Sequence, residues 1–355
     1  MRLAVAKSTL ESLLINLQPF LEKKDTSQIT SHVLLIANEN KMVAKATDQE
    51  IGLKTTTEHV DIQLDGKATA NGKKLLDIVR ILKEENIILE TIDETLHIKQ
   101  GNSKFKLPMF NAEEFPEFPN LNNLPSIELN SMELIQMFKK VSPAIDTNNP
   151  KYELNGALLN IKENQIDIVG TDTRRLAIGK IENSNDKTLS MIIPKKAIIE
   201  IQKLFFDQIE IFYNETNLII RTKDYYFYTH LINGKYPDYE RIVPKSLKYT
   251  ITLPKSKIIE SIKQITTISQ EIKMTFENNS IIFKSLGEEN SEAETEMEFN
   301  TGFNEKFVLA VNSKYLLDFL SQIDSEEFNM GLNEPNLPFI VQSGNFHTVI
   351  MPIII

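Results

Sequence analysis

The chain repeats one short pattern six times, at a spacing of 58 to 66 residues. Each copy is the end of an apolar strand, a polar start and then a short amphipathic helix. The first lysine or serine of each predicted helix marks the six copies: Lys7, Lys73, Ser131, Lys195, Lys255 and Ser313. A fixed period of this length indicates a repeated architecture. Six units with one helix each predict three domains of two units.

The helical windows share one pattern, with apolar side chains at helical spacing and charged side chains opposite them. The predicted helices cover 7–17, 73–83, 131–140, 195–203, 255–263 and 313–321. We expect Ser8, Ser131 and Ser313 to cap their helices. Between helices the apolar residues alternate with period two, as in 104–107 and 210–213, which indicates strands. The fold class is therefore α+β.

Two stretches have the composition of linkers. Residues 111–125 hold three prolines and show no periodic pattern, and residues 234–249 hold Pro237 and Pro244. Both stretches fall where the repeat count places a domain boundary. We therefore expect domains at about 1–122, 123–247 and 248–355.

The composition excludes several classes of protein. The 355 residues contain no cysteine, so disulfide frameworks, thiolate metal sites and cysteine catalysis are excluded. Lys7 and Glu11 interrupt the apolar N-terminal stretch, which does not read as a signal peptide. No uncharged run approaches the roughly 18 residues that a membrane span needs. We expect a soluble, cytoplasmic protein without a membrane partner.

Charge is distributed unevenly along the chain. The net charge is −10, yet the six helical windows hold 14 Lys and Arg against 6 Asp and Glu. An amphipathic helix often has a solvated charged face, and for one helix that interpretation suffices. A basic bias shared by six helices in an acidic chain instead favours contact with phosphates, without reading of base sequence.

The sequence contains no recognisable catalytic constellation. Its five histidines are scattered over strand-like segments, and no phosphate-binding glycine loop or metalloprotease motif occurs. Asp167 and Asp172 could be paired carboxylates, but a turn or cap role for Asp172 is favoured. We therefore expect neither an enzyme nor a bound cofactor or metal.

Two strand segments carry opposite charges on one face each. Lys104 and Lys106 alternate with Phe105 and Leu107, and acidic residues alternate through 292–298. Charged edge strands usually prevent aggregation. Complementary ones can instead pair between subunits, and the pattern leaves both interpretations open.

Four strings resemble segments of one known family, the bacterial sliding clamps, which are the beta subunits of DNA polymerase III. They are Gly170–Ile178 (GTDTRRLAI), Ile232–Pro244 (INGKYPDYERIVP), Lys151–Gly156 (KYELNG) and Val349–Ile353 (VIMPI). The resemblance runs end to end. It implies three similar domains, each with two helices backed by antiparallel sheets, in a dimer closed head to tail into a ring around duplex DNA.

Helix geometry agrees with a ring of two chains. Helices pack about 9–10 Å apart, so six in a circle give a diameter of only about 19 Å between axes. A helix radius of about 5 Å per side then leaves too little room for a duplex. Twelve helices give about 38 Å, and a bore near 28 Å that accepts a duplex about 20 Å wide.

The resemblance implies a DNA sliding clamp, a processivity factor and not an enzyme. It would encircle double-stranded DNA without sequence preference and tether the catalytic subunit of the replicative polymerase through a short-peptide pocket. The clamp loader and other proteins with clamp-binding motifs are the further implied partners. The competing interpretations are a β-rich enzyme of nucleic-acid metabolism and a peptide-binding scaffold that does not bind DNA.

The resemblance also assigns residues to sites. The peptide-binding positions are Leu154, Thr171, Arg175, Leu176, Pro237, Arg241, Ile242, Asn312, Tyr315, Pro338, Val349, Met351, Pro352 and Ile353. We expect Leu176, Ile242, Val349 and Met351 to form the apolar floor of this pocket. Two residues depart from the family pattern at its mouth, where Thr173 replaces the usual glycine and Arg174 the usual histidine.

Further positions are expected to contact DNA or a second copy of the chain. The resemblance gives Lys24, Lys73, Lys74 and Tyr152 as DNA contacts, and the basic helices add Arg80, Lys195 and Lys196, expected on solvated helix faces. Glu153 stands where the family often has a second aromatic residue. The residues expected at the interface between domain one of one chain and domain three of the other are Lys104, Phe105, Lys106, Leu107, Ile268, Glu294, Glu296 and Glu298.

Overall fold

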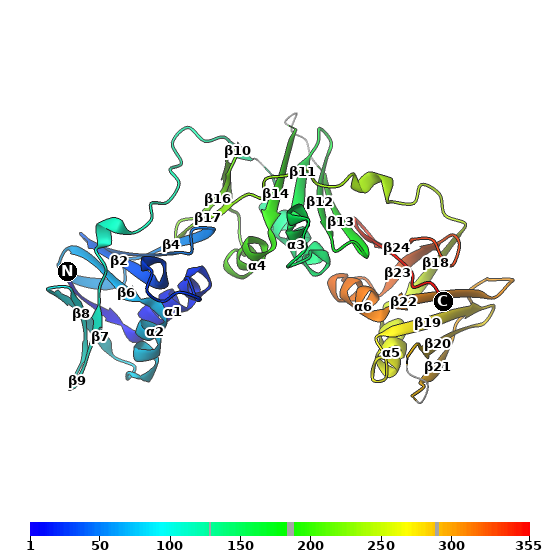
Figure 1. Ribbon diagram of the computed structural model, residues 1–355, viewed down its shortest axis with the longest axis horizontal. Coiled ribbons are helices and arrows are strands. Elements are labelled where there is room, and N and C mark those ends of the chain that lie inside the picture. Colours follow the sequence, from blue (N-terminus) through cyan, green and yellow to red (C-terminus); the bar gives the residue numbers. More distant parts are fainter. Residues whose placement is uncertain (128, 183–187, 288–290) are drawn as a thin grey trace. The chain divides into compact units, whose positions relative to one another are not determined.

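The computed structural model describes residues 1–127, 129–182, 188–287 and 291–355. Contacts between residues divide the chain into two compact units. The first comprises Met1–Glu128 and Lys203–Leu231, and the second comprises Leu129–Gln202 and Ile232–Ile355. Figure 1 traces the chain through both units.

The α-helices begin at, or one residue before, the six markers of the sequence repeat. Over the described residues they are α1 (Lys7–Leu17), α2 (Gly72–Ile81), α3 (Ser131–Val141), α4 (Lys195–Leu204), α5 (Lys255–Thr266) and α6 (Ser313–Gln322). The amphipathic windows therefore predicted every one of these helices. Each buries an apolar stripe, as α2 does with Leu75, Leu76 and Val79.

The expected serine caps are wrong by one or two residues. Ser131 and Ser313 are the first residues of their helices and are buried, while Ser8 is the second residue of α1. Asparagine caps three of the helices instead: the side chains of Asn71, Asn130 and Asn312 accept hydrogen bonds from backbone N–H groups of the first turn. An N-cap acceptor lies before the first helical residue, because only there can it reach these N–H groups.

Two antiparallel sheets build the first unit. One has the strand order β5 (Val60–Leu64), β1 (Arg2–Ala6), β7 (Asn86–Ile92), β8 (Thr95–Gln100), β9 (Ser103–Pro108). The other has the order β10 (Ser126–Ile127), β15 (Glu210–Tyr213), β16 (Asn217–Arg221), β17 (Tyr225–His230), β4 (Ile51–Thr57), β3 (Lys41–Thr47), β2 (His32–Asn38), β6 (Gly66–Asn71). In the second sheet β17 pairs with β4, so one sheet joins strands of the first and central predicted domains.

The second unit follows the same plan. Its larger sheet has the order β14 (Leu189–Pro194), β11 (Gly156–Ile161), β12 (Gln165–Thr171), β13 (Arg175–Glu182), β25 (Phe346–Ile350), β24 (Phe339–Ser343), β23 (Glu327–Leu332), β18 (Tyr249–Pro254). Its smaller sheet has the order β21 (Glu294–Glu298), β20 (Ser280–Ser285), β19 (Glu271–Glu277), β22 (Phe307–Asn312). Here β13 pairs with β25 and joins strands of the central and third predicted domains.

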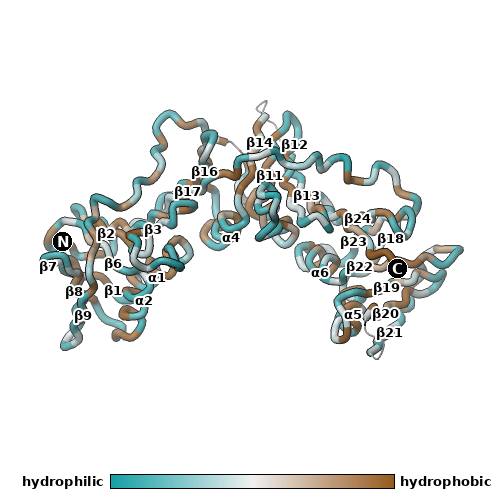
Figure 2. The backbone as a smooth tube through the Cα atoms, in the orientation of Figure 1, coloured by the Kyte–Doolittle hydropathy of each residue, from teal (hydrophilic) through white to brown (hydrophobic). Residues whose placement is uncertain are grey.

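Hydrophobic residues concentrate in the strands, whereas the connecting segments are mostly hydrophilic (Figure 2). Both predicted linkers nevertheless pack against a sheet through a few apolar side chains. Phe118 and Leu121 of the first linker contact a buried group that includes Tyr226. Tyr236 and Tyr239 of the second are themselves buried in the core of the second unit. The linkers are therefore straps held against the sheets. No helix among the described residues has the length and apolarity to cross a membrane.

Two histidines are buried in these sheets. His32 in β2 and His347 in β25 are 5 % and 7 % exposed. Burial lowers the pKa of each to about 4, with a smaller contribution from the nearby Lys74 charge at His32 and the Lys180 charge at His347. Their ordinary pKa is 6.5, so the unfolded chain binds protons at these residues before the folded chain does.

Acidification should therefore destabilise the fold between about pH 6.5 and pH 4. At pH 5 each histidine should reduce the free energy of unfolding by about 2 kcal/mol relative to pH 7.5. The free energy of unfolding can be measured in urea at pH 5 and at pH 7.5. The difference between the two values should be about 2 kcal/mol smaller for His347→Gln than for wild type. His59→Gln, at an exposed histidine, is the matched control. An unchanged pH dependence in His347→Gln would contradict the assignment.

Candidate functional site

The predicted peptide-binding residues all lie in the second unit. They come from η5 (Tyr152–Asn155), the end of β12 and the start of β13, the strap after β17, the junction of β22 with α6, the residue before β24, and the chain's last strand and tail. Strand pairing brings part of this set together, because Leu176 of β13 lies opposite Val349 of β25. Leu154, Leu176 and Val349 belong to one buried cluster with Tyr236 and Tyr239 of the strap.

The four expected floor residues divide into two pairs. Leu176 and Val349 are 2 % and 1 % exposed, so they are core beneath the surface. Ile242 and Met351 are 42 % and 39 % exposed and present apolar surface to solvent. Met351 lies one residue past β25, and its N–H still donates to the Arg174 carbonyl at 2.9 Å. Of the four, only Ile242 and Met351 are therefore accessible at the surface.

Arg175 holds the most buried charge of the site. Its Nε donates to Asp172 Oδ2 at 2.9 Å, one terminal nitrogen donates to Asp318 Oδ2 at 2.7 Å, and the other donates to the Pro143 carbonyl. The guanidinium lies over the Tyr315 ring, 4.6 Å from its centroid. A buried charge requires such compensation, so Arg175 ties β13 to α6.

The turn before Arg175 is tight and internally hydrogen-bonded. Asp172 Oδ1 accepts the N–H groups of Arg174 and Arg175, each at 3.0 Å. Thr171 Oγ1 donates to the Arg175 carbonyl at 2.6 Å. Thr173 has φ of 72°, a left-handed conformation that a β-branched residue rarely adopts. The predicted turn role of Asp172 is confirmed.

Asp167 belongs to a separate network that the sequence did not reveal. This carboxylate is 2 % exposed and accepts from Lys162 Nζ and from the Tyr239 hydroxyl, both at 2.7 Å. Lys162 Nζ also donates to Glu240 at 2.6 Å, and its neighbours raise the pKa of Lys162 against the effect of burial. The network fastens the strap of Pro237, Arg241 and Ile242 to the sheet. Asp167 and Asp172 are not a catalytic pair, because each serves its own structural contacts.

The remaining predicted peptide-site residues are partly exposed or form contacts of their own. Asn312 caps α6, Ile353 N–H donates to the Ala310 carbonyl at 2.8 Å, and Arg241 pairs with Asp238 at 2.7 Å. Pro237, Pro338 and Pro352 are half-buried. Asp318 was missed, because no local pattern in α6 shows that its carboxylate meets an arginine 143 residues away.

Most of the predicted DNA-contact side chains are exposed. In the first unit these are Lys24, after a short 3-10 turn, and Lys73, Lys74 and Arg80 on α2. Arg80 Nε lies 3.7 Å from Glu11. In the second unit Tyr152 is 63 % exposed and Lys196 is exposed.

The expectation that Lys195 lies on a solvated helix face is wrong. Its Nζ donates to the Ile145 carbonyl at 2.5 Å, and burial lowers its pKa. Lys195 is the first residue of α4, directly after β14. Its aliphatic stem is therefore partly buried, and its ammonium group forms a hydrogen bond within the protein. Its capacity for phosphate contact is correspondingly reduced.

The predicted interface strands are the outer strands of their sheets. β9 ends the five-stranded sheet, with Lys104 and Lys106 exposed and Leu107 buried. β21 ends the four-stranded sheet, with Glu294, Glu296 and Glu298 exposed. A groove of about 270 Å³ runs between β21 and α5, and Ile268 just past α5 is 47 % exposed. Each strand leaves an unpaired edge within its unit.

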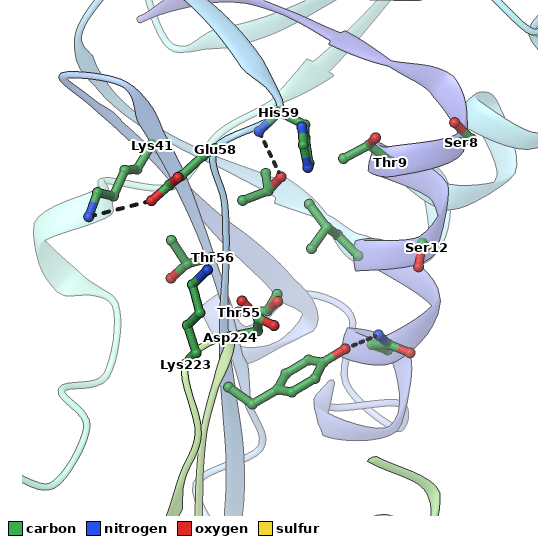
Figure 3. A pocket seen from close by; sticks show the side chains of 14 residues that line it. Ser8, Thr9, Ser12, Lys41, Thr55, Thr56, Glu58, His59, Lys223 and Asp224 are labelled. Carbon is green, nitrogen blue, oxygen red and sulfur yellow. Dashed lines mark hydrogen bonds and ion pairs between the residues drawn. The ribbon is translucent and has the colours of Figure 1, made fainter. Parts of the chain in front are cut away.

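A further pocket of about 660 Å³ lies beside α1 in the first unit (Figure 3). Ser8, Thr9 and Ser12 of α1 line one side of it, and threonines of β4 line another. Its lining carries both signs of charge, including a Lys41–Glu58 ion pair at 3.9 Å. None of the sequence-predicted site residues lines it. Among the described residues no cluster of side chains could hold a metal ion.

Comparison with known proteins agrees with this architecture. Three family models match in succession: the N-terminal domain of the DNA polymerase III beta subunit over residues 1–120, its central domain over 128–238 and its C-terminal domain over 240–354. The beta sliding clamp of Helicobacter pylori strain J99 is 41 % identical over 351 residues, covering 96 % of this chain and 94 % of that protein.

Solved structures give the same result. The Helicobacter pylori beta clamp bound to a DNA ligase peptide superposes with a TM-score of 0.95 at 41 % identity, with full coverage of both chains. The Bacillus subtilis DNA polymerase sliding clamp has a TM-score of 0.92 at 19 % identity, covering 100 % of this chain and 99 % of that one, which shows the fold alone.

Three consecutive clamp domains define a non-catalytic class of replication protein. The chain belongs to the family of the DNA polymerase III beta subunit, the bacterial sliding clamps. It acts as a clamp that confers processivity, and the α+β fold predicted from the repeat is confirmed.

Thr173→Gly should stabilise the second unit. A side chain in the left-handed region costs about 1–2 kcal/mol, and glycine removes that strain while losing some entropy on folding. We expect a gain of about 1 kcal/mol in the free energy of unfolding, measured by urea denaturation. Thr173→Ala keeps the Cβ atom and should gain less, so it is the matched control. A glycine variant less stable than wild type would contradict this account.

Proposed function

We propose that two copies of the chain close head to tail around double-stranded DNA, with domain one of each against domain three of the other. The supporting observation is the pair of free sheet edges, one bearing Lys104 and Lys106 and the other Glu294, Glu296 and Glu298. Opposite charges on adjacent strands attract, and an edge strand gains backbone hydrogen bonds when it pairs.

We further propose that the three domains of each chain are residues 1–122, 123–247 and 248–355, and that the protein is located in the cytoplasm.

The ring slides because its contacts with DNA are electrostatic and blind to sequence. Lys24, Lys73, Lys74, Arg80, Tyr152 and Lys196 contribute to these contacts, and Lys195 contributes less because of its internal hydrogen bond. Such contacts weaken with salt, as counterions compete for the phosphates. The topological closure, rather than affinity, keeps the clamp on DNA. A peptide-binding scaffold that does not bind DNA is the alternative.

Partners attach through the peptide site of the second unit. A relative of 41 % identity binds a DNA ligase peptide in its crystal structure, which supports a ligase as a partner. We infer that the polymerase catalytic subunit, the clamp loader and other proteins with clamp-binding motifs use the same site. The observation that carries this proposal is that Ile242 and Met351 are exposed, while Val243, next to Ile242, packs against the buried cluster of Leu176 and Val349. Apolar anchors such as Leu, Phe or Met would gain most from burial there.

Charge reversal on β21 tests the ring. The triple variant Glu294→Lys, Glu296→Lys, Glu298→Lys should elute as one chain in gel filtration, more so at low salt, because repulsion from Lys104 and Lys106 is then least screened. Wild type, once loaded, should stay on circular DNA and be lost when the circle is cut, whereas the variant should not be retained.

The matched control reverses the same number of exposed charges elsewhere in the second unit: Asp324→Lys, Glu326→Lys, Glu327→Lys. It should keep the wild-type mass. A triple β21 variant that still elutes as a dimer would exclude this strand from the interface. Equal release of wild type from circular and linear DNA would favour the scaffold alternative.

Met351→Ala tests the peptide site. Truncating a buried interface anchor usually costs about 1–3 kcal/mol of binding free energy, and Met351 is exposed enough for the fold to tolerate the change. Calorimetry with a peptide bearing a Leu-Phe anchor should show that loss. Met132→Ala is the matched control, since Met132 on α3 is 38 % exposed. Equal affinity of Met351→Ala and wild type, both folded, would exclude Met351 from the site.

A further inference from the structure

One arginine beside the exposed apolar residues has no carboxylate partner. Arg174 is exposed, and its carbonyl accepts the Met351 N–H at 2.9 Å, so the two residues are adjacent across the end of the β13–β25 pair. Within the part of the chain that the structure describes, the Arg174 side chain makes no hydrogen bond or ion pair. It therefore differs from the other cations around it.

Four neighbouring cations are engaged, three by carboxylates and Lys195 by the Ile145 carbonyl. Arg175 pairs with Asp172 and Asp318, Lys314 pairs with Asp318 at 2.8 Å, and Arg241 pairs with Asp238 at 2.7 Å. Asp318 is shared by two cations, Arg175 and Lys314, which both contact its Oδ2. Arg174 thus adds an exposed positive charge without a carboxylate partner to this surface, although the chain as a whole has a net charge of −10.

The backbone holds Arg174 in a defined place. Asp172 Oδ1 accepts its N–H at 3.0 Å, and its carbonyl is bonded to Met351. The charge of Arg174 also acts on Tyr315. Burial and the Asp172 charge raise the pKa of the Tyr315 hydroxyl, and the positive charges of Arg175 and Arg174 partly oppose that rise. Arg174 therefore lies between the apolar Met351 surface and the Tyr315 side of the site, with its guanidinium available.

A guanidinium in this position has a definite chemical preference. It binds a carboxylate through two parallel hydrogen bonds, while its aliphatic stem covers apolar surface. A peptide that buries an apolar side chain on Met351 would also exclude water from Arg174 and strengthen such a pair. A lysine or arginine at the same place in the peptide would be repelled.

We propose that Arg174 selects partner segments that carry an aspartate or glutamate next to their apolar anchor. This inference rests on the proposed peptide-binding function. It concerns which partners bind most tightly, since the apolar contacts alone would accept anchors regardless of the flanking charge. Arg174 is thus a specificity-determining residue of the site.

Synthetic peptides test this directly. Three peptides share a Leu-Phe anchor and differ in having Glu, Gln or Lys at the flanking position, with one series placing that residue before the anchor and one after it. In at least one series, calorimetry at low salt should show wild type binding the Glu peptide about 3- to 10-fold tighter than the Gln peptide, and the Lys peptide more weakly still. High salt should reduce the difference.

Arg174→Gln should bind the Gln peptide as wild type does and lose its preference for the Glu peptide. Arg174→Lys should keep part of the preference, and Lys180→Gln, at an exposed lysine on the same strand, should keep all of it. Equal binding of Glu and Gln peptides by wild type, or a preference that survives in Arg174→Gln, would overturn the inference alone. Failure of every peptide to bind wild type would overturn the proposed function and the inference with it.

Discussion

Antiparallel pairing of β13 with β25 is the interaction on which the second unit depends. It places Leu176 opposite Val349 and joins strands from the central and third domains into one eight-stranded sheet. In the first unit β17 pairs with β4 in the same way. A sheet edge exposed at either junction would leave unpaired backbone groups. Continuity of the sheets therefore joins consecutive domains more firmly than a flexible linker could.

The proposed peptide site is a consequence of that continuity. The turn before β13 and the residue after β25 meet at one end of the paired strands, where Met351 bonds to Arg174. Exposed apolar side chains are stable at this place because the layer beneath them is fully packed. Buried Arg175 adds rigidity, since two carboxylates and the Tyr315 ring hold its guanidinium. A rigid surface loses less entropy when a partner docks on it.

The strap after β17 supplies the other side of the proposed site. Tyr236 and Tyr239 are buried, and the Tyr239 hydroxyl meets Asp167, which Lys162 also neutralises. This arrangement fastens a segment with little regular structure, so that Ile242 is presented at a fixed position. Composition alone identified this segment as a linker, and its prolines agree with that. Its function as a packed strap depends on partners far away in sequence.

The sequence by itself determined the six helices, the three-domain α+β plan and the family, because amphipathic periods and short motifs are local properties of the chain. It also placed Asp172 in a turn. Only the tertiary structure decided that β4 and β17, and β13 and β25, are neighbours, that asparagines cap three helices, and that Lys195 bonds to Ile145. The Arg175–Asp318 pair spans 143 residues. Such contacts form between side chains of different repeats, and no local pattern of apolar or charged residues encodes which of them will meet.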